Sequence, residues 1–150
     1  MKQNNSSPSS LIESKEKIFS LFRTAQKKLR EQVAKESQQH GFTYPQMFLI
    51  FSLYKNPGIN LNDLSERLEL SKSTVSGIIN RLVSQQIVIR EIPEEDRRTV
   101  RLFLDPDFLS RFNIQEFKDD LLSDLLKDAS KEDLDSILCG FEKMLEFMHK

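Results

Sequence analysis

The chain has 150 residues and a mass of 17.5 kDa, which fits one domain of ordinary size with extensions. Its 22 Lys and Arg against 23 Asp and Glu give a formal net charge of −1, which argues against a uniformly basic nucleic-acid-binding domain. The 38% hydrophobic content argues against wholesale disorder, and a single Cys excludes a disulfide framework or a Cys-rich zinc site. With only four Gly and five Pro, the chain is expected to be mainly helical.

The longest nearly unbroken apolar run, residues 47–54, is far shorter than the roughly 20 residues of a membrane span. No early apolar stretch resembles the core of a signal peptide. We therefore expect a soluble, cytoplasmic protein without a membrane partner.

The near-zero total charge hides an asymmetry along the chain. Residues 1–37 carry a net charge of +4, whereas residues 106–150 carry −5. Such an asymmetry indicates a binding partner, and the opposite charges favour association of the two terminal segments with each other.

The N-terminal part is expected to be a tail followed by a long helix. Residues 1–10 are polar and of low complexity, which predicts a disordered tail. Over residues 11–40, apolar residues recur at steps of three and four, which predicts a helix with a heptad-like seam. The seam residues are Leu11, Ile18, Phe22, Ala25, Leu29 and Val33. Gly41 is expected to end this helix, since Gly readily adopts the left-handed conformation of helix ends.

An apolar helix is expected next. Thr43 and Gln46 form a capping-box pattern ahead of residues 44–55, which are apolar almost all round. A helix of this kind belongs in the centre of a core.

Two short helices are expected to follow, joined by a tight turn. Asn60 is expected to cap a helix over about residues 60–69, and Ser71 one over about residues 72–85. The positions of the second helix that should point inward are Val75, Ile78, Ile79, Leu82 and Val83.

From residue 87 the apolar pattern changes from that of a helix to that of strands. Residues 87–89 and 100–104 are rich in β-branched and apolar side chains, and the polar residues 93–98 lie between them. This pattern predicts an antiparallel hairpin with a charged tip.

Two more helices are expected at the C-terminal end. The first, over residues 106–127, is expected to be capped by Asp105, and the second to open at Ser130 with Asp133. The second helix carries another heptad-like apolar seam. Cys139 lies among its apolar residues and is expected to be a small buried hydrophobe.

Two short helices followed by a hairpin are typical of a winged helix-turn-helix, in which the second helix enters the major groove of DNA. The outer face of the helix over residues 72–85 supplies donors and acceptors but no carboxylate, which phosphate would repel. The candidate DNA-contacting residues on this face are Ser71, Lys72, Ser73, Thr74, Ser76, Asn80 and Arg81.

The expected hairpin is locally cationic. Arg97, Arg98 and Arg101 lie close together in sequence, and an arginine at a hairpin tip is well shaped to enter a narrow minor groove. A solvated turn, with the tip arginines paired to Glu94 and Glu95, is the alternative. The preceding helix-turn-helix favours DNA contact by Arg97 and Arg98.

Six short motifs follow one another along residues 41–104. They are Gly41-Phe42-Thr43-x-x-Gln46, Leu61-x-x-Leu64-Ser65-x-Arg67-Leu68, Ser71-Lys72-Ser73-Thr74-Val75-Ser76, Asn80-Arg81-Leu82, Ile87-Val88-x-Arg90 and Asp96-Arg97-Arg98. In the order and spacing of these motifs, residues 41–104 resemble the MarR (multiple antibiotic resistance regulator) family of bacterial transcription factors. The last motif is the Asp-x-Arg wing signature of the family. The flanking helices match the family in placement and periodicity.

The resemblance implies a winged helix-turn-helix DNA-binding domain over residues 41–105. Residues 11–40 and 106–150 of two protomers would form a helical dimerisation region. The implied protein is a homodimer that binds a pseudopalindromic double-stranded DNA operator, usually as a repressor. A small aromatic effector could bind between the two regions, and no cofactor is implied.

The resemblance also assigns roles within the hairpin. Arg98 would enter the minor groove, held by an ion pair with Asp96, and Arg101 would support the wing.

Three positions depart from the family pattern, and one of them, Asp105 in place of a common Thr after the second strand, is an equally good cap from which we expect no consequence. Gln86 stands where the family usually has a helix-ending Gly, and because a left-handed non-Gly residue costs on the order of 1 kcal/mol, we expect this cap to be built differently. Gly77 replaces a larger residue and could let the backbone approach DNA closely.

Other interpretations stay open at this stage. A helical adaptor that has lost DNA binding is the alternative function, favoured by Gly77 and by the acidic C-terminal segment. The terminal seams could also be ordinary intramolecular core, because periodicity does not separate a partner from the same chain. An enzyme is not favoured, since the chain has no glycine-rich phosphate loop, HExxH motif or nucleophile elbow. His40 and His149 lie far apart and make a poor metal site.

Overall fold

The computed structural model describes residues 8–149 and is mostly helical, with a two-stranded antiparallel hairpin. In chain order the elements are α1 (Pro8–Gln39), α2 (Tyr44–Lys55), α3 (Leu61–Leu68), α4 (Lys72–Ser84), β1 (Val88–Glu91), β2 (Arg101–Leu104), α5 (Pro106–Arg111), α6 (Ile114–Leu125) and α7 (Lys131–Met148).

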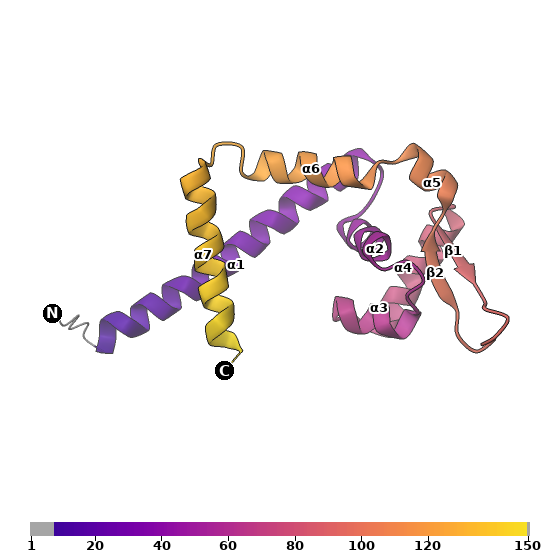
Figure 1. Cartoon of the computed structure of the whole chain (residues 1–150), viewed down its shortest axis with the longest axis horizontal. Coiled ribbons are helices and arrows are strands. Elements are labelled where there is room, and N and C mark those ends of the chain that lie inside the picture. Colours follow the sequence, from indigo (N-terminus) through magenta and orange to yellow (C-terminus); the bar gives the residue numbers. More distant parts are fainter. Residues whose placement is uncertain (1–7, 150) are drawn as a thin grey trace.

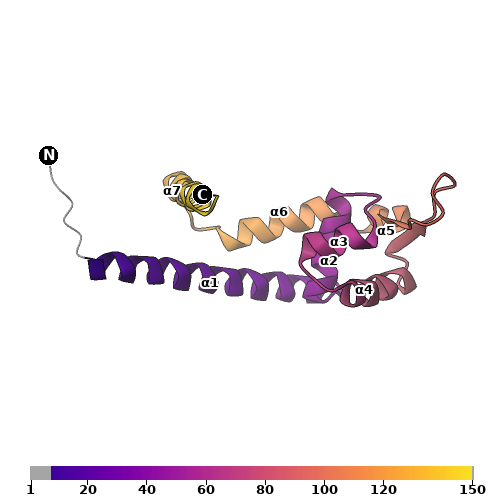
Figure 2. The same ribbon diagram turned by 90° about the horizontal axis from the view of Figure 1, so that it is seen from below.

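The molecule has two parts of different shape. Helices α2 to α5 and the hairpin form a compact lobe, whereas α1, α6 and α7 form an arm that extends from it to one side (Figure 1). The view from below shows the same arrangement, with α1 and α6 both leaving the lobe and α7 at the far end (Figure 2). No helix within residues 8–149 is long and apolar enough to cross a membrane.

The long N-terminal helix begins earlier than expected. The predicted tail, residues 1–10, is wrong for its last three residues, which belong to α1. Pro8 stands at the first position of the helix, where its fixed φ suits the helix and its missing N–H costs no hydrogen bond. Residues 1–7 of the predicted tail lie outside the described residues.

The end of α1 and the start of α2 follow the sequence expectations. Gly41 has φ +80°, and the N–H of Phe42 donates to the carbonyl of Ser37 at 3.0 Å, which is the Schellman arrangement. Thr43 and Gln46 then form the predicted capping box, in which the N–H of Thr43 donates to Oε1 of Gln46 at 2.9 Å.

Helix α2 runs through the centre of the lobe and supplies much of its core. Met47, Leu49, Ile50 and Leu53 are buried, as expected for an apolar helix. Phe48 is different, since 44% of it is exposed. The other buried apolar residues of the lobe include Ile59, Leu64, Val75, Ile79, Leu82, Ile87, Val88, Leu102, Leu104 and Phe108.

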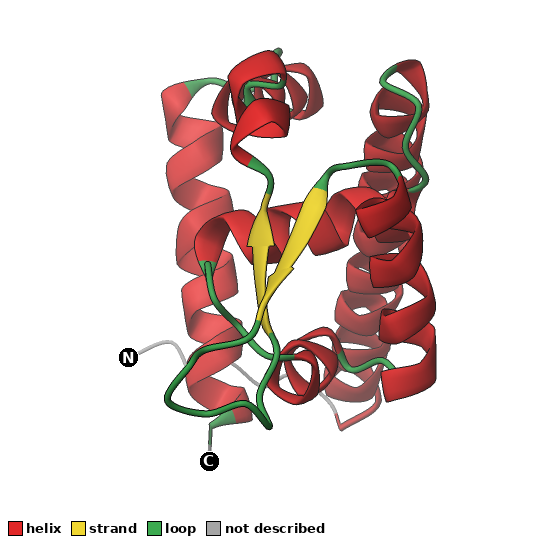
Figure 3. Cartoon of the chain, turned by 90° about the vertical axis from the view of Figure 1, so that its right-hand side faces the viewer, coloured by secondary structure: helices red, strands yellow, loops and turns green. Residues whose placement is uncertain are grey.

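The hairpin packs against the lobe through one face, with its strands and the long loop between them visible in Figure 3. Val88 pairs with Leu104 and Arg90 with Leu102, in antiparallel register. A third segment joins the edge of β2, where the N–H of Leu102 donates to the carbonyl of Ile59 at 3.0 Å. This bridge, which the sequence analysis missed, fixes the hairpin to the turn before α3.

The single helix predicted over residues 106–127 is wrong, because it is broken into α5 and α6. Phe112 is extended between them, and Asn113 caps α6 by accepting a hydrogen bond from the N–H of Glu116 at 3.1 Å. The break turns the ring of Phe112 toward Phe42, at a centroid distance of 5.7 Å. The pair Asn113 and Glu116 was the sequence signal for this second start.

Two helices of the lobe end on left-handed residues other than Gly. Gln86 has φ +56° and Glu69 has φ +52°. After Gln86, the N–H of Ile87 donates to the carbonyl of Leu82 at 2.9 Å, so the cap has the same Schellman arrangement that a Gly would give. The expectation that this cap is built differently is therefore wrong. Ile87, which follows the strained residue, is buried.

Two helices of the arm, α1 and α7, bury little apolar surface within one chain, whereas Ile114, Phe117 and Leu121 of α6 are buried. Of the α1 seam only Val33 is buried, and α7 has no buried residue at all. Leu138 is 59% exposed and Phe141 46%. Cys139 is also exposed, so the prediction that it is buried is wrong for the single chain. Because successive residues turn roughly 100° about a helix axis, Cys139 lies nearly opposite Phe141 and away from the seam.

Candidate nucleic-acid interface

The outer face of α4 is exposed and free of carboxylates. Its inner residues Val75, Ile79 and Leu82 are fully buried, and this anchors the helix in the lobe. The predicted contact residues Lys72, Ser73, Gly77, Asn80 and Arg81 are exposed and Ser76 is half-buried, so the helix turns the face that the sequence predicts away from the core.

The N-terminus of α4 carries a cluster of three hydroxyl groups. Oγ of Ser71 accepts from the N–H of Thr74 at 3.1 Å, and it lies 3.0 Å from Oγ of Ser73 and 2.7 Å from Oγ1 of Thr74. Lys72 stands beside them, and the first N–H groups of a helix carry partial positive charge. The cluster can therefore donate to an anionic oxygen from several directions.

The hairpin tip is shaped by Asp96, but not in the way the resemblance implied. Oδ1 of Asp96 accepts from the backbone N–H of Arg98 at 3.1 Å, and Oδ2 accepts from the hydroxyl of Thr99 at 2.7 Å. Within residues 8–149, Asp96 and Arg98 form no ion pair. The hydrogen bonds from Thr99 and Arg98 hold the pKa of the Asp96 carboxyl below its ordinary value.

Asp96 therefore builds the turn and leaves the arginine side chains of the tip unpaired. Arg97 and Arg98 are both exposed. In the described part of the chain neither forms an ion pair with Glu94 or Glu95, which was the alternative for this turn. The charge of both guanidinium groups remains available to a partner.

Arg101 is the first residue of β2, at the loop end of the hairpin, where it pairs with Glu91. Its Nη1 donates to the carbonyl of Gly58 at 3.1 Å, which ties β2 to the turn before α3. The interpretation of Arg101 as a wing-supporting residue agrees with this bond.

Asn80 contacts a residue that the sequence analysis did not select. Nη2 of Arg90, on β1, donates to Oδ1 of Asn80, on α4. Arg90, Ser76 and Arg98 line the same hollow of about 400 Å³ between α4 and the hairpin. The only signal for Arg90 was its place in the Ile87-Val88-x-Arg90 motif.

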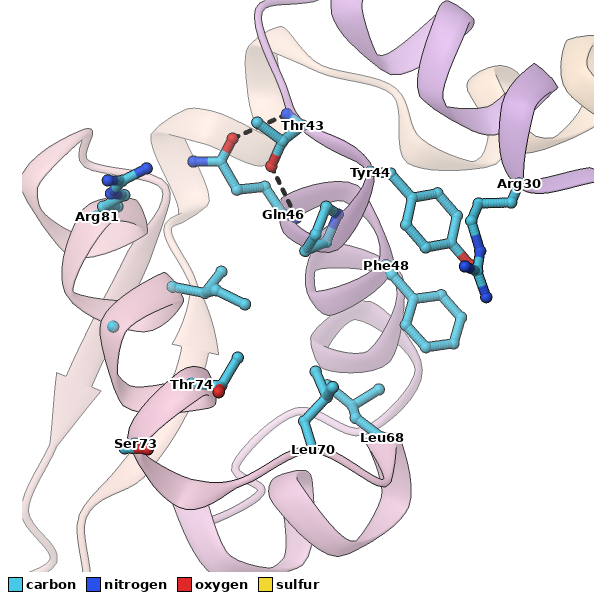
Figure 4. A pocket seen from close by; sticks show the side chains of 13 residues that line it. Arg30, Thr43, Tyr44, Gln46, Phe48, Leu68, Leu70, Ser73, Thr74 and Arg81 are labelled. Atoms are coloured by element: carbon cyan, nitrogen blue, oxygen red, sulfur yellow. Dashed lines mark hydrogen bonds between the residues drawn. The ribbon is translucent and has the colours of Figure 1, made fainter. Parts of the chain in front are cut away.

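A larger cavity, of about 730 Å³, lies between α1, α2, α3 and α4 (Figure 4). Tyr44 stacks on Phe48 at 5.9 Å, and the guanidinium carbon of Arg30 lies 5.7 Å from the centroid of Tyr44. Leu68, Leu70 and Ile78 add apolar surface, and Arg81 stands at the opposite wall. No carboxylate lines the cavity. An aromatic ring and an anionic group would both find matching surface here.

Comparison with known proteins decides the family. The model of the MarR family matches residues 42–100, which span α2 to the wing. This part of the chain belongs to the MarR family.

The similarity to MarR-family proteins extends beyond this domain. The organic hydroperoxide resistance transcriptional regulator of Bacillus subtilis is 26% identical over 111 residues, which are 73% of this chain and 74% of that protein. A MarR transcriptional regulator from Methanosarcina mazei has a solved structure with a TM-score of 0.72 and 25% identity, covering 87% of this chain and 95% of that one. Structural similarity thus includes the helices of the arm.

MepR of S. aureus has been solved as a complex with DNA, and that structure has the same fold. Its TM-score is 0.68 at 21% identity, and the match covers 85% of this chain and 95% of that one. The chain spans about half the length of another curated relative that it matches.

Proposed function

We propose that this chain is a sequence-specific regulator of transcription that binds double-stranded DNA. The observation that carries the proposal is the exposed, carboxylate-free face of α4 beside a hairpin tip with two unpaired arginines. The fold shared with MepR, which was crystallised with DNA, supports it. Phosphate contacts would position the protein, and contacts to base edges would select the sequence.

In this proposal α4 lies in the major groove and the wing reaches the adjacent minor groove. The hydroxyl cluster and Lys72 would meet the DNA backbone where the helix begins. Gly77 leaves open space at the middle of the helix, so the backbone can approach base edges closely. Arg98 would enter the minor groove from the turn that Asp96 builds.

We also propose that the chain acts as a homodimer through its arm. The apolar seams of α1 and α7 are exposed in the single chain and line an open groove of about 380 Å³ that includes Phe22, Ile137 and Phe141. Residues 11–40 and 106–150 would form the dimerisation region, and their opposite net charges favour this association. Two-fold symmetry then matches a pseudopalindromic operator with half-sites roughly 34–36 Å apart.

The cavity between α1 and α4 suits a small aromatic acid as effector. Its ring would pack against Tyr44 and Phe48, and its carboxylate would meet Arg30 or Arg81. Ser73, Gly77 and Arg81 line this cavity and also lie on the candidate DNA face. A ligand bound in the cavity would therefore contact residues of α4 that also face DNA. This shared surface supports the proposal that an effector releases the protein, as a repressor, from its operator.

A mobility-shift assay with DNA from the promoter region of the protein's own gene tests the proposal. We expect a sequence-selective shift at low salt that weakens as salt increases. Arg98→Ala should weaken binding about thirtyfold, since a direct contact to DNA contributes roughly 1–3 kcal/mol. Lys72→Ala should weaken binding to all sequences alike and reduce the salt dependence by about one charge.

The assay also separates the regulator from an adaptor that has lost DNA binding. If wild-type protein gives no sequence-selective shift at low salt, the proposed function is wrong. Arg111→Ala is a suitable control for charge, because Arg111 lies at the end of α5, outside the candidate interface. It should leave the shift unchanged.

A further inference from the structure

The hollow between α4 and the hairpin has a polar lining that comes from four separate segments. Asn60 and Asn62 stand at the start of α3, Ser76 on α4, Arg90 on β1, and Arg98 and Thr99 in the wing. Two side chains are cationic, and no carboxylate lines the hollow. A group that enters it meets neutral donors on one side and guanidinium groups on the other, which suits a phosphodiester oxygen.

Arg90 reaches this hollow because of the register of the hairpin. It pairs with Leu102, which is only 2% exposed, and it lies on the same side of β1 as the buried Val88. Its side chain therefore leaves the hairpin on the face turned toward the lobe, at the margin of the core. Arg90 itself is exposed, so solvent can satisfy its charge, and an acceptor in the protein serves to fix the direction of its long side chain.

Asn80 supplies that acceptor. The hydrogen bond from Nη2 of Arg90 to Oδ1 of Asn80 joins β1 to the exposed face of α4. Guanidinium groups have only donors, so the carbonyl oxygen of the Asn80 amide must face Arg90. An asparagine that reads adenine uses its oxygen and its nitrogen together. The bond to Arg90 occupies one of the two lone pairs of this oxygen and fixes the direction in which the amide group points.

We propose that Asn80 is a positioning residue that holds Arg90 for contact with a phosphate of the DNA backbone in this hollow. This inference rests on the proposed function. One acceptor uses one of the five donors of a guanidinium, and the others stay free to meet phosphate beside Arg98. A phosphate bound by Arg90 on the hairpin would then have a fixed position relative to α4, because Asn80 of α4 holds Arg90. The recognition helix and the wing would therefore bind DNA as one unit.

Double-mutant cycles test the inference, with affinity measured on the same promoter fragment at fixed salt. Arg90→Ala should weaken binding about thirtyfold and lower the salt dependence by about one charge. Asn80→Ala should weaken binding about fivefold without changing the salt dependence, because it removes no charge. In the Arg90→Ala background, Asn80→Ala should have no further effect.

Arg98 gives the matched control cycle. It lines the same hollow, but its side chain is not bound to Asn80 in the described structure. The losses from Asn80→Ala and Arg98→Ala should therefore multiply. Circular dichroism and thermal melting of each variant test whether the lobe remains folded. We expect that it does, because Asn80, Arg90 and Arg98 are all exposed.

Three results would overturn the inference while wild-type protein still binds selectively. The first is that the losses of affinity from Asn80→Ala and Arg90→Ala multiply, so that the two residues act independently. The second is that Asn80 is coupled to Arg98 as strongly as to Arg90. The third is that the loss of affinity in Asn80→Ala depends on the identity of one base pair of the operator. The last would mean that Asn80 reads a base. Absence of selective binding by wild-type protein would instead overturn the proposed function, and this inference with it.

Discussion

The lobe and the arm use their apolar residues in opposite ways. In the lobe, Leu49, Ile79 and Leu82 are fully buried within one chain, and the exposed face of α4 is polar. In the arm, α7 buries nothing and presents Leu138 and Phe141 to solvent. The lobe thus has a packed core within one chain, whereas α1 and α7 present apolar seams to solvent, which the proposed dimer would cover. Stability of the lobe should depend on its own packing, and stability of the arm on protein concentration.

Truncation of the lobe core should have the largest effect. Ile79→Ala should lower the free energy of unfolding by about 4 kcal/mol, because it removes a fully buried side chain from a packed site. Denaturant unfolding measures this loss. Ile78→Ala is the matched control on the same helix, since Ile78 is only half-buried, and it should cost much less. Equal losses for the two variants would contradict the described core.

A charge in the arm seam should act on assembly. Phe141→Glu should weaken the homodimer about a hundredfold, or about 3 kcal/mol, because a carboxylate would be buried in the apolar interface. Light scattering over a range of concentrations should show a shift toward the mass of one chain, while the helical signal of the lobe persists. Ser136→Glu places the same charge on the opposite side of α7 and should leave the mass unchanged. A monomeric wild-type protein, or equal effects of both variants, would contradict the proposed interface.

The wing should respond less strongly. Asp96→Ala should weaken DNA binding about fivefold, because the carboxylate holds the turn that carries Arg98, and in the proposed complex it acts through that turn. Thr99→Val removes only the hydroxyl that donates to Asp96 and should have a smaller effect in the same direction. Neither change should alter the mass of the dimer or the unfolding of the lobe core. An unchanged affinity for Asp96→Ala would show that the turn forms without its carboxylate.

The contrast between the two regions also explains what the sequence predicts well. Helix starts are local, and the side chains that cap them lie within three residues of one another. The capping box at Thr43 and the helix start at Ser130 with Asp133 were therefore predicted correctly. The inner face of α4 was predicted correctly for the same reason, since apolar periodicity depends on one helix alone.

Features that depend on distant contacts were missed or mistaken. The break at Phe112 packs a half-buried aromatic ring against Phe42, which lies 70 positions earlier in the sequence. The bond between Asn80 and Arg90 requires the register of the hairpin as well as its place beside α4. In the arm, periodicity identified the seams but could not state whether a second chain covers them.

The smallest predicted effect concerns the strained cap at the end of α4. Gln86 is held in the left-handed region at φ +56°, where a side chain with a Cβ costs on the order of 1 kcal/mol. Gln86→Gly removes that cost but adds freedom to the unfolded chain, so the free energy of unfolding should rise by about 0.5 kcal/mol. Gln85, its neighbour, has φ −88°, and Gln85→Gly gains no relief of strain and should destabilise the lobe by about 0.5–1 kcal/mol. Gln85→Gly also removes an acceptor that lies 3.5 Å from Nε2 of Gln46, so the relief of backbone strain is read from the rise in stability of Gln86→Gly itself. Destabilisation by both variants would mean that the Gln86 side chain contributes more than its conformation costs.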